Sequence, residues 1–345
     1  MFFSIIIPVY NAEKYIAKMF NQLRQQEYKD FEVYFINDGS KDNSHDIIKN
    51  LICEEKNFHL IDKENEGPSA ARNVGLKYIK GQYVLFLDAD DYISDKYMLK
   101  NIHRILQNKD FDLLIYGYKV VNKTGNVLKE IEVPNRVLSN SNAVQNSMFE
   151  ISKLNAFPSV WNKVYKAEII KHHEIRFAPE LYIGEDLYFN LCFLKKCSTL
   201  RIINKAYYGY MQSDNSIIRR YNSDKYEQLL TLFKYKRKVI STFKENQEGE
   251  FKAYFDSEYQ RIIVSCVMEN FKKTNVNRKV IIKDIHYMLR KYQMKNLHKN
   301  FRFLSTKRKI VNLIFVTRNE VLLYLFSKIC FNIKKNAKKY TFLDE

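Results

Sequence analysis

The 345-residue sequence is poor in the residues that define several protein classes. It holds 5 cysteines, an odd number, and no Cys-x-x-Cys pair, so a disulfide framework and a zinc site are excluded. With 9 glycines and 5 prolines, it also lacks flexible linkers and low-complexity tracts. These absences indicate a globular protein of a reducing compartment, and we expect it in the cytoplasm.

Long apolar runs are missing as well. The first eight residues are apolar, but they have neither a basic segment nor a small-residue cleavage site, so we expect no signal peptide. Near the end, the apolar stretch 313–316 stops at the polar residues 317–320. A membrane-spanning helix needs roughly 18 to 20 apolar residues, and no stretch approaches that length.

Acidic residues are scarce in the C-terminal part. Residues 270–345 contain 19 Lys and Arg against 4 Asp and Glu, whereas the residues before them contain 38 against 35. Most of the formal net charge of +18 therefore belongs to this segment. Such a surplus indicates a polyanionic partner, which is an anionic membrane surface, an anionic polymer or nucleic acid.

Strand and helix patterns alternate in the first part of the chain, and a helical, aromatic pattern begins near residue 220. Short connections between alternating elements predict a parallel α/β sheet, whose ligands bind beyond the carboxyl ends of the strands. We therefore expect an α/β domain at 1–219 and a helical, basic region at 220–345. The predicted strands are 2–8, 31–36, 58–61, 83–87 and 112–121, and the predicted helices are 11–26 (capped by Asn11), 42–53, 70–79, 98–106, 140–151 and one within 180–194.

The stretch 83–92 is the feature around which the rest is organised. A buried strand pattern ends there in three carboxylates, Asp88, Asp90 and Asp91. At a strand end, residues i and i+2 point to the same side, roughly 7 Å apart. Carboxylates this close repel each other unless a cation lies between them, and Mg²⁺ or Mn²⁺ shared with phosphate oxygens fits. A polar capped turn would use the same residues, so this stretch alone leaves both interpretations open.

Five short motifs follow one another along the chain. They are Pro8-Val9-Tyr10-Asn11, Asn37-Asp38-Gly39-Ser40-x-Asp42, Asn65-x-Gly67-x-x-x-x-Arg72-Asn73, Asp88-Ala89-Asp90-Asp91 and Gly184-Glu185-Asp186. In this order and at these spacings, the sequence resembles the family 2 glycosyltransferases, bacterial enzymes that build capsule, exopolysaccharide and teichoic-acid glycans. The resemblance covers about residues 1–220. It implies the GT-A fold, a Rossmann-like, mostly parallel sheet flanked by helices, here followed by a helical C-terminal region.

The resemblance implies a UDP-sugar as donor. Pro8 would fix the turn that places Tyr10 for stacking on the nucleobase, unless Tyr10 is a core residue. Asp38 would accept the imide N–H of uracil, unless it serves a local Asx turn. Asn65 and Arg72, near a helix start, suit anions or base carbonyls.

The resemblance also implies a divalent metal. Asp88 would lie at the ribose and Asp90 at the Mn²⁺ or Mg²⁺ that bridges the diphosphate. Asp91 would lie near either of them or contact the acceptor or sugar. Many relatives carry a metal-binding histidine where this chain has Ser213, so water, Asp214 or another nearby group would replace it. His172 and His173 are the nearest histidines in sequence, and we interpret them as surface residues.

Members of the family invert the anomeric carbon in one displacement, which requires a general base opposite the leaving diphosphate. The acidic pair of the family matches Glu185 and Asp186. We assign Asp186 as the base and Glu185 as a contact to acceptor or sugar. Alternatively, both acids merely favour the N-terminus of the following helix. Trp161, in a segment that recurs in the family, either packs under the sugar or acceptor or belongs to the core.

The expected activity is transfer of a hexosyl or N-acetylhexosaminyl group from a UDP-sugar to a hydroxyl of a cell-surface glycan or lipid-linked acceptor. One alternative is a non-catalytic module that binds nucleotide sugars. A nucleotidyltransferase is disfavoured because 8–11 is not a glycine-rich, basic loop. A polyanion-binding or nucleic-acid-binding protein is a further alternative, but no recognised motif supports it, and we expect no nucleic acid.

The basic tail at 307–339 combines lysines with apolar residues that fit one side of a helix. An amphipathic basic helix suits the anionic inner leaflet of a bacterial membrane, so we expect peripheral association there. A packed bundle with solvated lysines, a homo-oligomer interface and an acceptor-binding region are the alternatives. The apolar residues are Ile310, Leu313, Ile314, Val321, Leu325 and Ile329.

Overall fold

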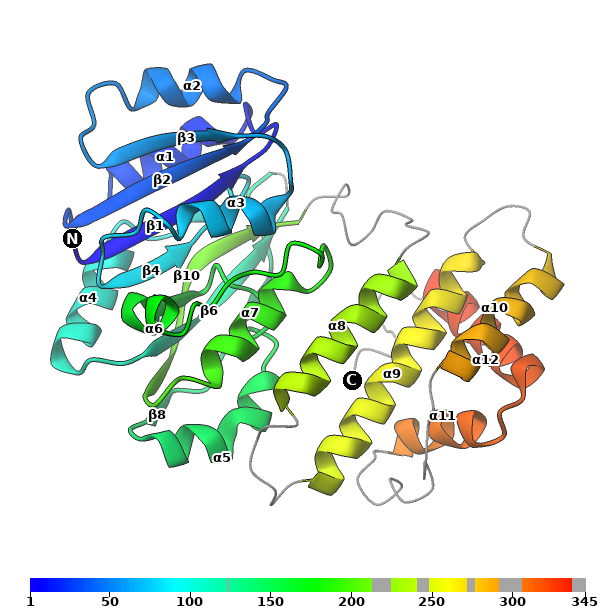
Figure 1. Ribbon diagram of the computed structural model, residues 1–345. Helices are drawn as coiled ribbons and strands as arrows, with labels where there is room; N and C mark the ends of the chain where they lie inside the picture. The colour runs from blue at the N-terminus through cyan, green and yellow to red at the C-terminus, as the bar shows by residue number, and fades with distance from the viewer. Residues whose placement is uncertain (123, 213–224, 241–247, 272–276, 292–305, 337–345) are drawn as a thin grey trace. The chain divides into compact units, whose positions relative to one another are not determined.

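The computed structural model describes residues 1–122, 124–212, 225–240, 248–271, 277–291 and 306–336 (Figure 1). The chain forms two compact units. The first comprises Met1–Arg220 with Val239–Phe243, and the second comprises Tyr221–Lys238 with Lys244–Glu345. A mixed α/β sheet flanked by helices, followed by a helical region, confirms the fold class predicted from the sequence.

The described elements of the first unit are ten strands in one sheet and seven helices. The strands are β1 (Phe3–Val9), β2 (Phe31–Asp38), β3 (Phe58–Lys63), β4 (Tyr83–Phe86), β5 (Tyr92–Ile93), β6 (Leu113–Val121), β7 (Val127–Ile131), β8 (Arg136–Leu138), β9 (Lys163–Lys166) and β10 (Leu200–Met211). The helices are α1 (Ile16–Arg24), α2 (Ser44–Leu51), α3 (Pro68–Gly75), α4 (Met98–Asn108), α5 (Ser141–Ser152), α6 (Ala167–His172) and α7 (Glu185–Leu194).

The sheet has the strand order β3-β2-β1-β4-β9-β6-β10-β5, with β7 added to β6 and β8 added to β10. β1 pairs in parallel with β2 and β4, and β2 pairs in parallel with β3. The carboxyl ends of these four strands therefore meet at one edge of the sheet. β9 is antiparallel to β4 and β6, and so joins this half to the parallel pair of β6 and β10.

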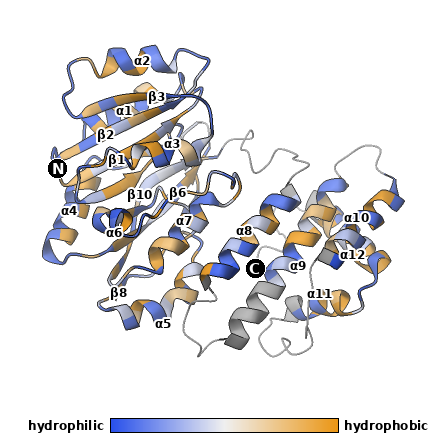
Figure 2. Cartoon of the chain, viewed as in Figure 1, coloured by the Kyte–Doolittle hydropathy of each residue, from blue (hydrophilic) through white to orange (hydrophobic). Residues whose placement is uncertain are grey.

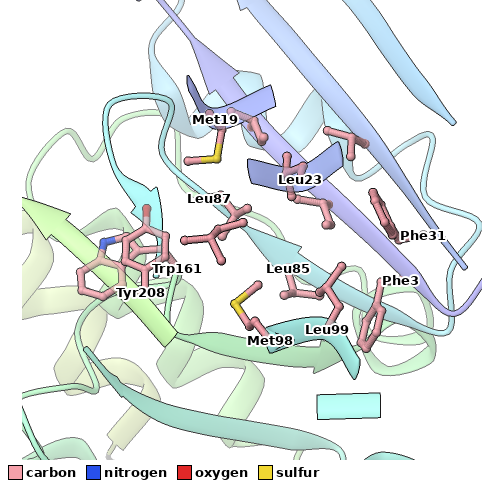
Figure 3. Close-up of a cluster of buried hydrophobic side chains, with 14 of the residues drawn as sticks. Phe3, Met19, Leu23, Phe31, Leu85, Leu87, Met98, Leu99, Trp161 and Tyr208 are labelled. Atoms are coloured by element: carbon pink, nitrogen blue, oxygen red, sulfur yellow. The ribbon is translucent and has the colours of Figure 1, made fainter. Parts of the chain in front are cut away.

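Alternating residues of the central strands serve two hydrophobic layers. On one face, side chains of β1 and β4 pack with α1 and α4, and Figure 3 shows Leu85 among residues of these helices. On the other face, Phe86 meets Phe189 of α7 edge-on, with ring centroids 5.4 Å apart. There α3 lies so close to β1 that a Cβ on Gly75 would be 2.5 Å from Cγ2 of Ile6. This close contact fixes α3 on the sheet.

The start of the chain differs from the prediction in two details. β1 continues through Pro8 to Val9. A proline is tolerated there because β4 pairs with β1 only as far as Ile6, so the missing N–H of Pro8 removes no hydrogen bond between β1 and β4. Asn11 does not cap a helix, since α1 begins at Ile16. Asn11 has φ +50° and its side-chain oxygen accepts the N–H of Lys41, which ties it to the loop after β2.

β9 and β10 are absent from the sequence-based prediction. β9 is only four residues long and begins with the buried Lys163, so it lacks the signature of a core strand. β10 contains register shifts between Ile203 and Tyr208, which interrupt its period of two. These missed strands matter because β10 lies behind the acidic motif.

The remaining helices are α8 (Lys225–Ile240), α9 (Glu248–Asn270), α10 (Arg278–Lys291), α11 (Thr306–Val316) and α12 (Glu320–Asn336). α12 packs on α9 and α10. Among the described residues, no helix combines the length and the apolar character needed to cross a membrane. All five cysteines are free in the structure.

Candidate active site

Four predicted residues lie where the first four strands end. Tyr10 follows β1 with 49% of its surface exposed, so it is not a core residue. Asp38 ends β2 and is buried, Asn65 follows β3 and is exposed, and Asp88 follows β4 and is half-buried. Because these strands are parallel, the four residues share one edge of the sheet, as the sequence predicts. Pro8 lies inside β1, directly before this edge.

Asp38 fastens the loop that enters α3. Its Oδ1 accepts hydrogen bonds from Nζ of Lys63 at 2.6 Å and from the N–H of Glu66 at 3.0 Å. Its Oδ2 accepts the N–H of Gly67 at 2.8 Å. The turn after β2 is closed instead by Asn37, whose side-chain oxygen accepts the N–H of Ser40, so an Asx turn is not the role of Asp38. A uracil imide would share the carboxylate with these donors.

Arg72 connects two parts of the site that are far apart in the sequence. Its guanidinium is buried in α3, with Nη2 2.8 Å from Oδ1 of Asp88 and Nη1 3.0 Å from Oδ1 of Asp186. Nη1 is also 3.7 Å from Oε1 of Glu185. Within the described residues, Nε of Arg72 has no acceptor. One guanidinium thus faces three carboxylates, and the group as a whole is short of positive charge.

Asp186 is the second residue of α7, whose N-cap Gly184 has a φ of +78°. Its Oδ2 accepts the N–H of Val160 at 3.3 Å. Burial raises the pKa of Asp186 to about 7, Arg72 opposes the shift, and Glu185 and Asp88 add to it. A carboxylate with a pKa near neutrality is suited to general-base work. The helix N-terminus also favours both acids, but that alone does not account for the bridge through Arg72.

The acidic motif after β4 contains two different kinds of carboxylate. Asp91 is buried, and its oxygens accept the O–H of Tyr208 and the N–H of Met211, each at 2.7 Å. Burial, with the charges of Asp88 and Asp90, raises the pKa of Asp91 well above its usual range. Asp90 is exposed, and desolvation followed by the charge of Asp88 raises its pKa. Asp91 therefore anchors the motif to β10, while Asp90 points to the outside.

Asp88 and Asp90 have the donor chemistry of a magnesium or manganese site. Their mutual repulsion is what a bound cation would relieve, and carboxylate oxygens suit these ions. In the part of the chain that the structure describes, no cluster of three or more His, Cys, Asp or Glu forms a metal site. The two residues would thus fit a metal together with oxygens of a substrate. Ser213 and Asp214 lie outside the described residues.

The two histidines considered as replacement ligands are exposed, as predicted. His172 ends α6 and lines a pocket with Phe2 and Tyr83, at the start of β1 and β4. This pocket is at the opposite edge of the sheet from Asp90, so His172 is not a ligand there.

Trp161 belongs to the core, which decides between its two interpretations. It is 6% exposed and stacks on Tyr208 with ring centroids 4.6 Å apart and planes 12° apart (Figure 3). Tyr210 stacks on it at 5.7 Å and Tyr118 meets it edge-on at 4.5 Å. Because Tyr208 also holds Asp91, this aromatic cluster supports the acidic motif from behind.

Comparison with known proteins assigns the part of the chain that contains most of these residues to a protein family. A sequence model described as "Glycosyl transferase family 2" matches residues 4–172. This part of the chain is a family 2 glycosyl transferase domain. The match contains all the predicted donor and metal residues, and it ends before Glu185 and Asp186.

Curated relatives of the family 2 domain include enzymes of Streptococcus pneumoniae and Staphylococcus aureus. Glycosyltransferase GlyA of Streptococcus pneumoniae is 30% identical over 222 residues, which are 63% of this chain and 31% of GlyA. Poly(ribitol-phosphate) beta-N-acetylglucosaminyltransferase TarS of Staphylococcus aureus is 32% identical over 215 residues, 60% of this chain and 35% of TarS. This chain therefore spans about a third of the length of these two relatives.

The fold has a counterpart over nearly the whole chain. A crystal structure of S. aureus TarS 1–349 in complex with UDP-GlcNAc matches with a TM-score of 0.69 and 21% sequence identity. The match covers 98% of this chain and 93% of that one. The helical second unit as well as the family 2 domain therefore has a known fold.

Sequence analysis missed the residues that support the acids of the family 2 domain from within. Lys163 is fully buried, and its Nζ donates to the carbonyls of Ala156 and Ser159 and to Oδ1 of Asn162. Burial lowers the pKa of Lys163 far below its usual range. These bonds shape the segment that presents the N–H of Val160 to Asp186. The available signal was a lysine in the largely apolar stretch 160–165, which implies a buried amine whose hydrogen bonds are satisfied.

Proposed function

We propose that this chain transfers a hexosyl or N-acetylhexosaminyl group from a UDP-sugar to a hydroxyl of a cell-surface glycan or lipid-linked acceptor, with inversion at the anomeric carbon. The observation that carries the proposal is the Arg72 bridge. It joins Asp88, on the proposed donor side, to Asp186, a carboxylate whose pKa is raised to about 7. The family 2 match and the transferase names of the relatives support the same activity.

The donor side supports a uridine nucleotide. Tyr10 exposes half of its surface beside the strand ends, where an aromatic face can stack on a base. Asp38 lies at the same edge and would accept the imide N–H of uracil, and exposed Asn65 would contact the nucleotide. S. aureus TarS 1–349, which shares the fold, binds UDP-GlcNAc, and this supports a UDP-sugar here as well.

In the proposed step, the acceptor oxygen attacks the anomeric carbon while the bond from that carbon to the diphosphate oxygen breaks. The hydroxyl proton passes to Asp186, and the electron pair of the broken bond leaves with UDP. Asp186 is ionised above its pKa of about 7, so it can take the proton at neutral or higher pH. Arg72 orients this carboxylate and stabilises its charge, and Glu185 would contact the acceptor or the sugar.

Asp90, with the neighbouring Asp88, would hold Mn²⁺ or Mg²⁺. The ion would neutralise the charge that develops on the departing diphosphate. Asp90 suits this role because it is exposed and forms no ion pair with the described Lys, Arg or His residues.

Release of UDP from a panel of UDP-sugars tests the proposal. Wild type is assayed with MnCl₂ or with chelator, with and without poly(ribitol phosphate) as acceptor, and with donor binding measured separately. We expect one donor to be turned over in the presence of metal. Asp186→Asn should keep donor binding and lose about 100-fold or more in kcat, because a positioned base contributes 10²–10⁴-fold.

The matched control is Asp110→Asn, an exposed, ion-paired carboxylate at the opposite edge of the sheet. It should turn over donor like wild type. Asp90→Ala should lose the response to metal. Absence of binding of any UDP-sugar, with or without metal, would refute the donor assignment, and an active Asp186→Asn would refute the base.

A further inference from the structure

Helix α12 has apolar side chains on two opposite sides. The apolar Leu323 and Cys330, together with the polar Ser327, are buried on the side that packs in the second unit. The other side carries four exposed residues, which we call the α12 stripe: Leu322 (40% exposed), Leu325 (46%), Ile329 (57%) and Ile333 (47%). Figure 2 shows the hydrophobic colouring of residues in α11 and α12.

The α12 stripe is one continuous line along the helix. Its residues are spaced by three, four and four positions, which places them on one face. At 1.5 Å per residue, the stripe is about 16 Å long. A helix with one buried apolar side and a second, exposed one has a surface that solvent does not favour.

The segment that contains the α12 stripe is basic. Exposed bases on and around α10 to α12 include Lys279, Lys283, Arg290, Lys309, Arg318 and Lys328. Of the two acids among the described residues here, Asp284 is exposed and Glu320 is bound to His286 at 2.8 Å. The stripe therefore lies within a strongly positive part of the chain.

We propose that the α12 stripe inserts into the interface of an anionic lipid bilayer, with lysines and arginines of the same segment on the headgroups. This combination of an exposed apolar face and a basic segment is what such an interface binds. A second copy of the chain is a poor partner, because residues 270–345 carry 19 bases against 4 acids and two such segments repel each other. A soluble polyanion would satisfy the bases but offers no apolar surface to the stripe.

This inference concerns attachment, and it does not depend on the proposed transferase activity. Since no described helix can span a bilayer, α12 would lie along the surface. A membrane-bound enzyme would have a lipid-linked or membrane-held acceptor within reach.

Flotation of the full chain with lipid vesicles tests the proposal. Wild type, Leu325→Gln/Ile329→Gln and Lys328→Glu are mixed with vesicles of pure phosphatidylcholine or of phosphatidylcholine with phosphatidylglycerol. We expect wild type to bind the anionic vesicles and to be released by salt. The double variant should lose at least about tenfold in vesicle affinity, because two exposed aliphatic side chains no longer enter the interface. Lys328→Glu should lose less.

The matched control is Val127→Gln/Leu128→Gln, which replaces two side chains of β7 that are 53% and 54% exposed. It removes equal apolar surface elsewhere and should bind vesicles like wild type. Circular dichroism and thermal unfolding verify that each variant is folded. Failure of wild type to float, or equal binding by a folded double variant, overturns the proposal. So does a sedimentation experiment in which the double variant turns a stable dimer into a monomer, since the stripe would then be a self-association surface.

Discussion

Two buried ion pairs lie at the same edge of the sheet and differ in how completely the negative charge is neutralised. Asp38 receives Lys63 and two backbone N–H groups, so a single carboxylate has three donors. Arg72 alone serves three carboxylates, of which Asp186 is one. In the first group one lysine balances one carboxylate, whereas the second group holds more negative charge than its one cation balances.

This difference in charge balance distinguishes an ion pair with a structural role from a group of acids whose protonation can change. The Asp38 pair holds a loop in place through three hydrogen bonds to one carboxylate. In the Arg72 group, burial and mutual repulsion raise the pKa of Asp186 to about 7, so that a proton can be gained or lost near neutral pH. The unequal distribution of cations thus distinguishes the proposed base, Asp186, from the loop that Asp38 holds on the proposed nucleotide side.

The largest expected effect on stability comes from replacing the cation of each ion pair, Arg72 or Lys63. Arg72→Met leaves three carboxylates in buried surroundings, and the free energy of unfolding at pH 8 should fall by about 3 to 5 kcal/mol. Lys63→Met leaves Asp38 with its two N–H donors, so the loss should be smaller, about 1 to 2 kcal/mol. Urea unfolding of both variants measures the difference. A larger loss for Lys63→Met would show that the Asp38 pair is the less balanced one.

A second prediction follows from the raised pKa of Asp186, ordinarily 3.8 and about 7 when folded. A raised pKa means that the group stabilises the fold fully below its unfolded pKa and that this contribution is lost as pH rises through 7. Asp186→Asn cannot titrate, so its stability relative to wild type should increase by about 2 to 4 kcal/mol between pH 4 and pH 8. Chemical denaturation across that range is the measurement. A constant difference would place the folded pKa of Asp186 at its ordinary value.

The residues at the edge of the sheet were predictable because they follow directly from short stretches of sequence. Each parallel strand is an apolar run followed by polar residues, so Tyr10, Asp38, Asn65 and Asp88 could be placed together before the structure was known. Asp186 could be proposed as an acid of the site only through the resemblance to a family, because more than a hundred residues separate it from Arg72.

The interior of the site was not predictable, since it depends on packing between distant elements. The Arg72 bridge requires α7 on the sheet face where Phe86 meets Phe189. Asp91 is an anchor because β10, whose pattern is interrupted by register shifts, brings Tyr208 behind it. From the sequence, Asp90 and Asp91 are adjacent acids with no sign of these different environments.

Asp90 and Asp91 should differ in the same way, with a smaller effect on stability. Asp91→Ala leaves the O–H of Tyr208 and the N–H of Met211 without their acceptor, and should cost about 1 to 3 kcal/mol of unfolding free energy. Asp90→Ala removes an exposed carboxylate and should change stability by less than about 0.5 kcal/mol. Thermal and urea unfolding in chelator test both, so that metal binding does not contribute. Equal costs would mean that Asp90 also serves the fold.

The smallest expected effect is on the pH dependence of the proposed reaction. This effect tests whether the ion pairs of Arg72 and Lys63 influence the pKa of the proposed base. If Asp186 is the base, kcat/KM for wild type should fall about tenfold per pH unit below its pKa of about 7. The positive charge of Arg72 lowers the pKa of Asp186. A lysine in place of Arg72 is a compact charge and lacks the forked guanidinium that reaches two carboxylates, so it should lower the pKa of Asp186 less than Arg72 does. The acid limb of Arg72→Lys should therefore move to higher pH, by about half a unit to one unit. Lys63→Arg, the matched change at Asp38, should leave the limb where it is, because that pair lies outside the group that titrates. An acid limb that moves equally in both variants would mean that the two ion pairs form one coupled network, and that Asp38 shares in setting the proton affinity of the base.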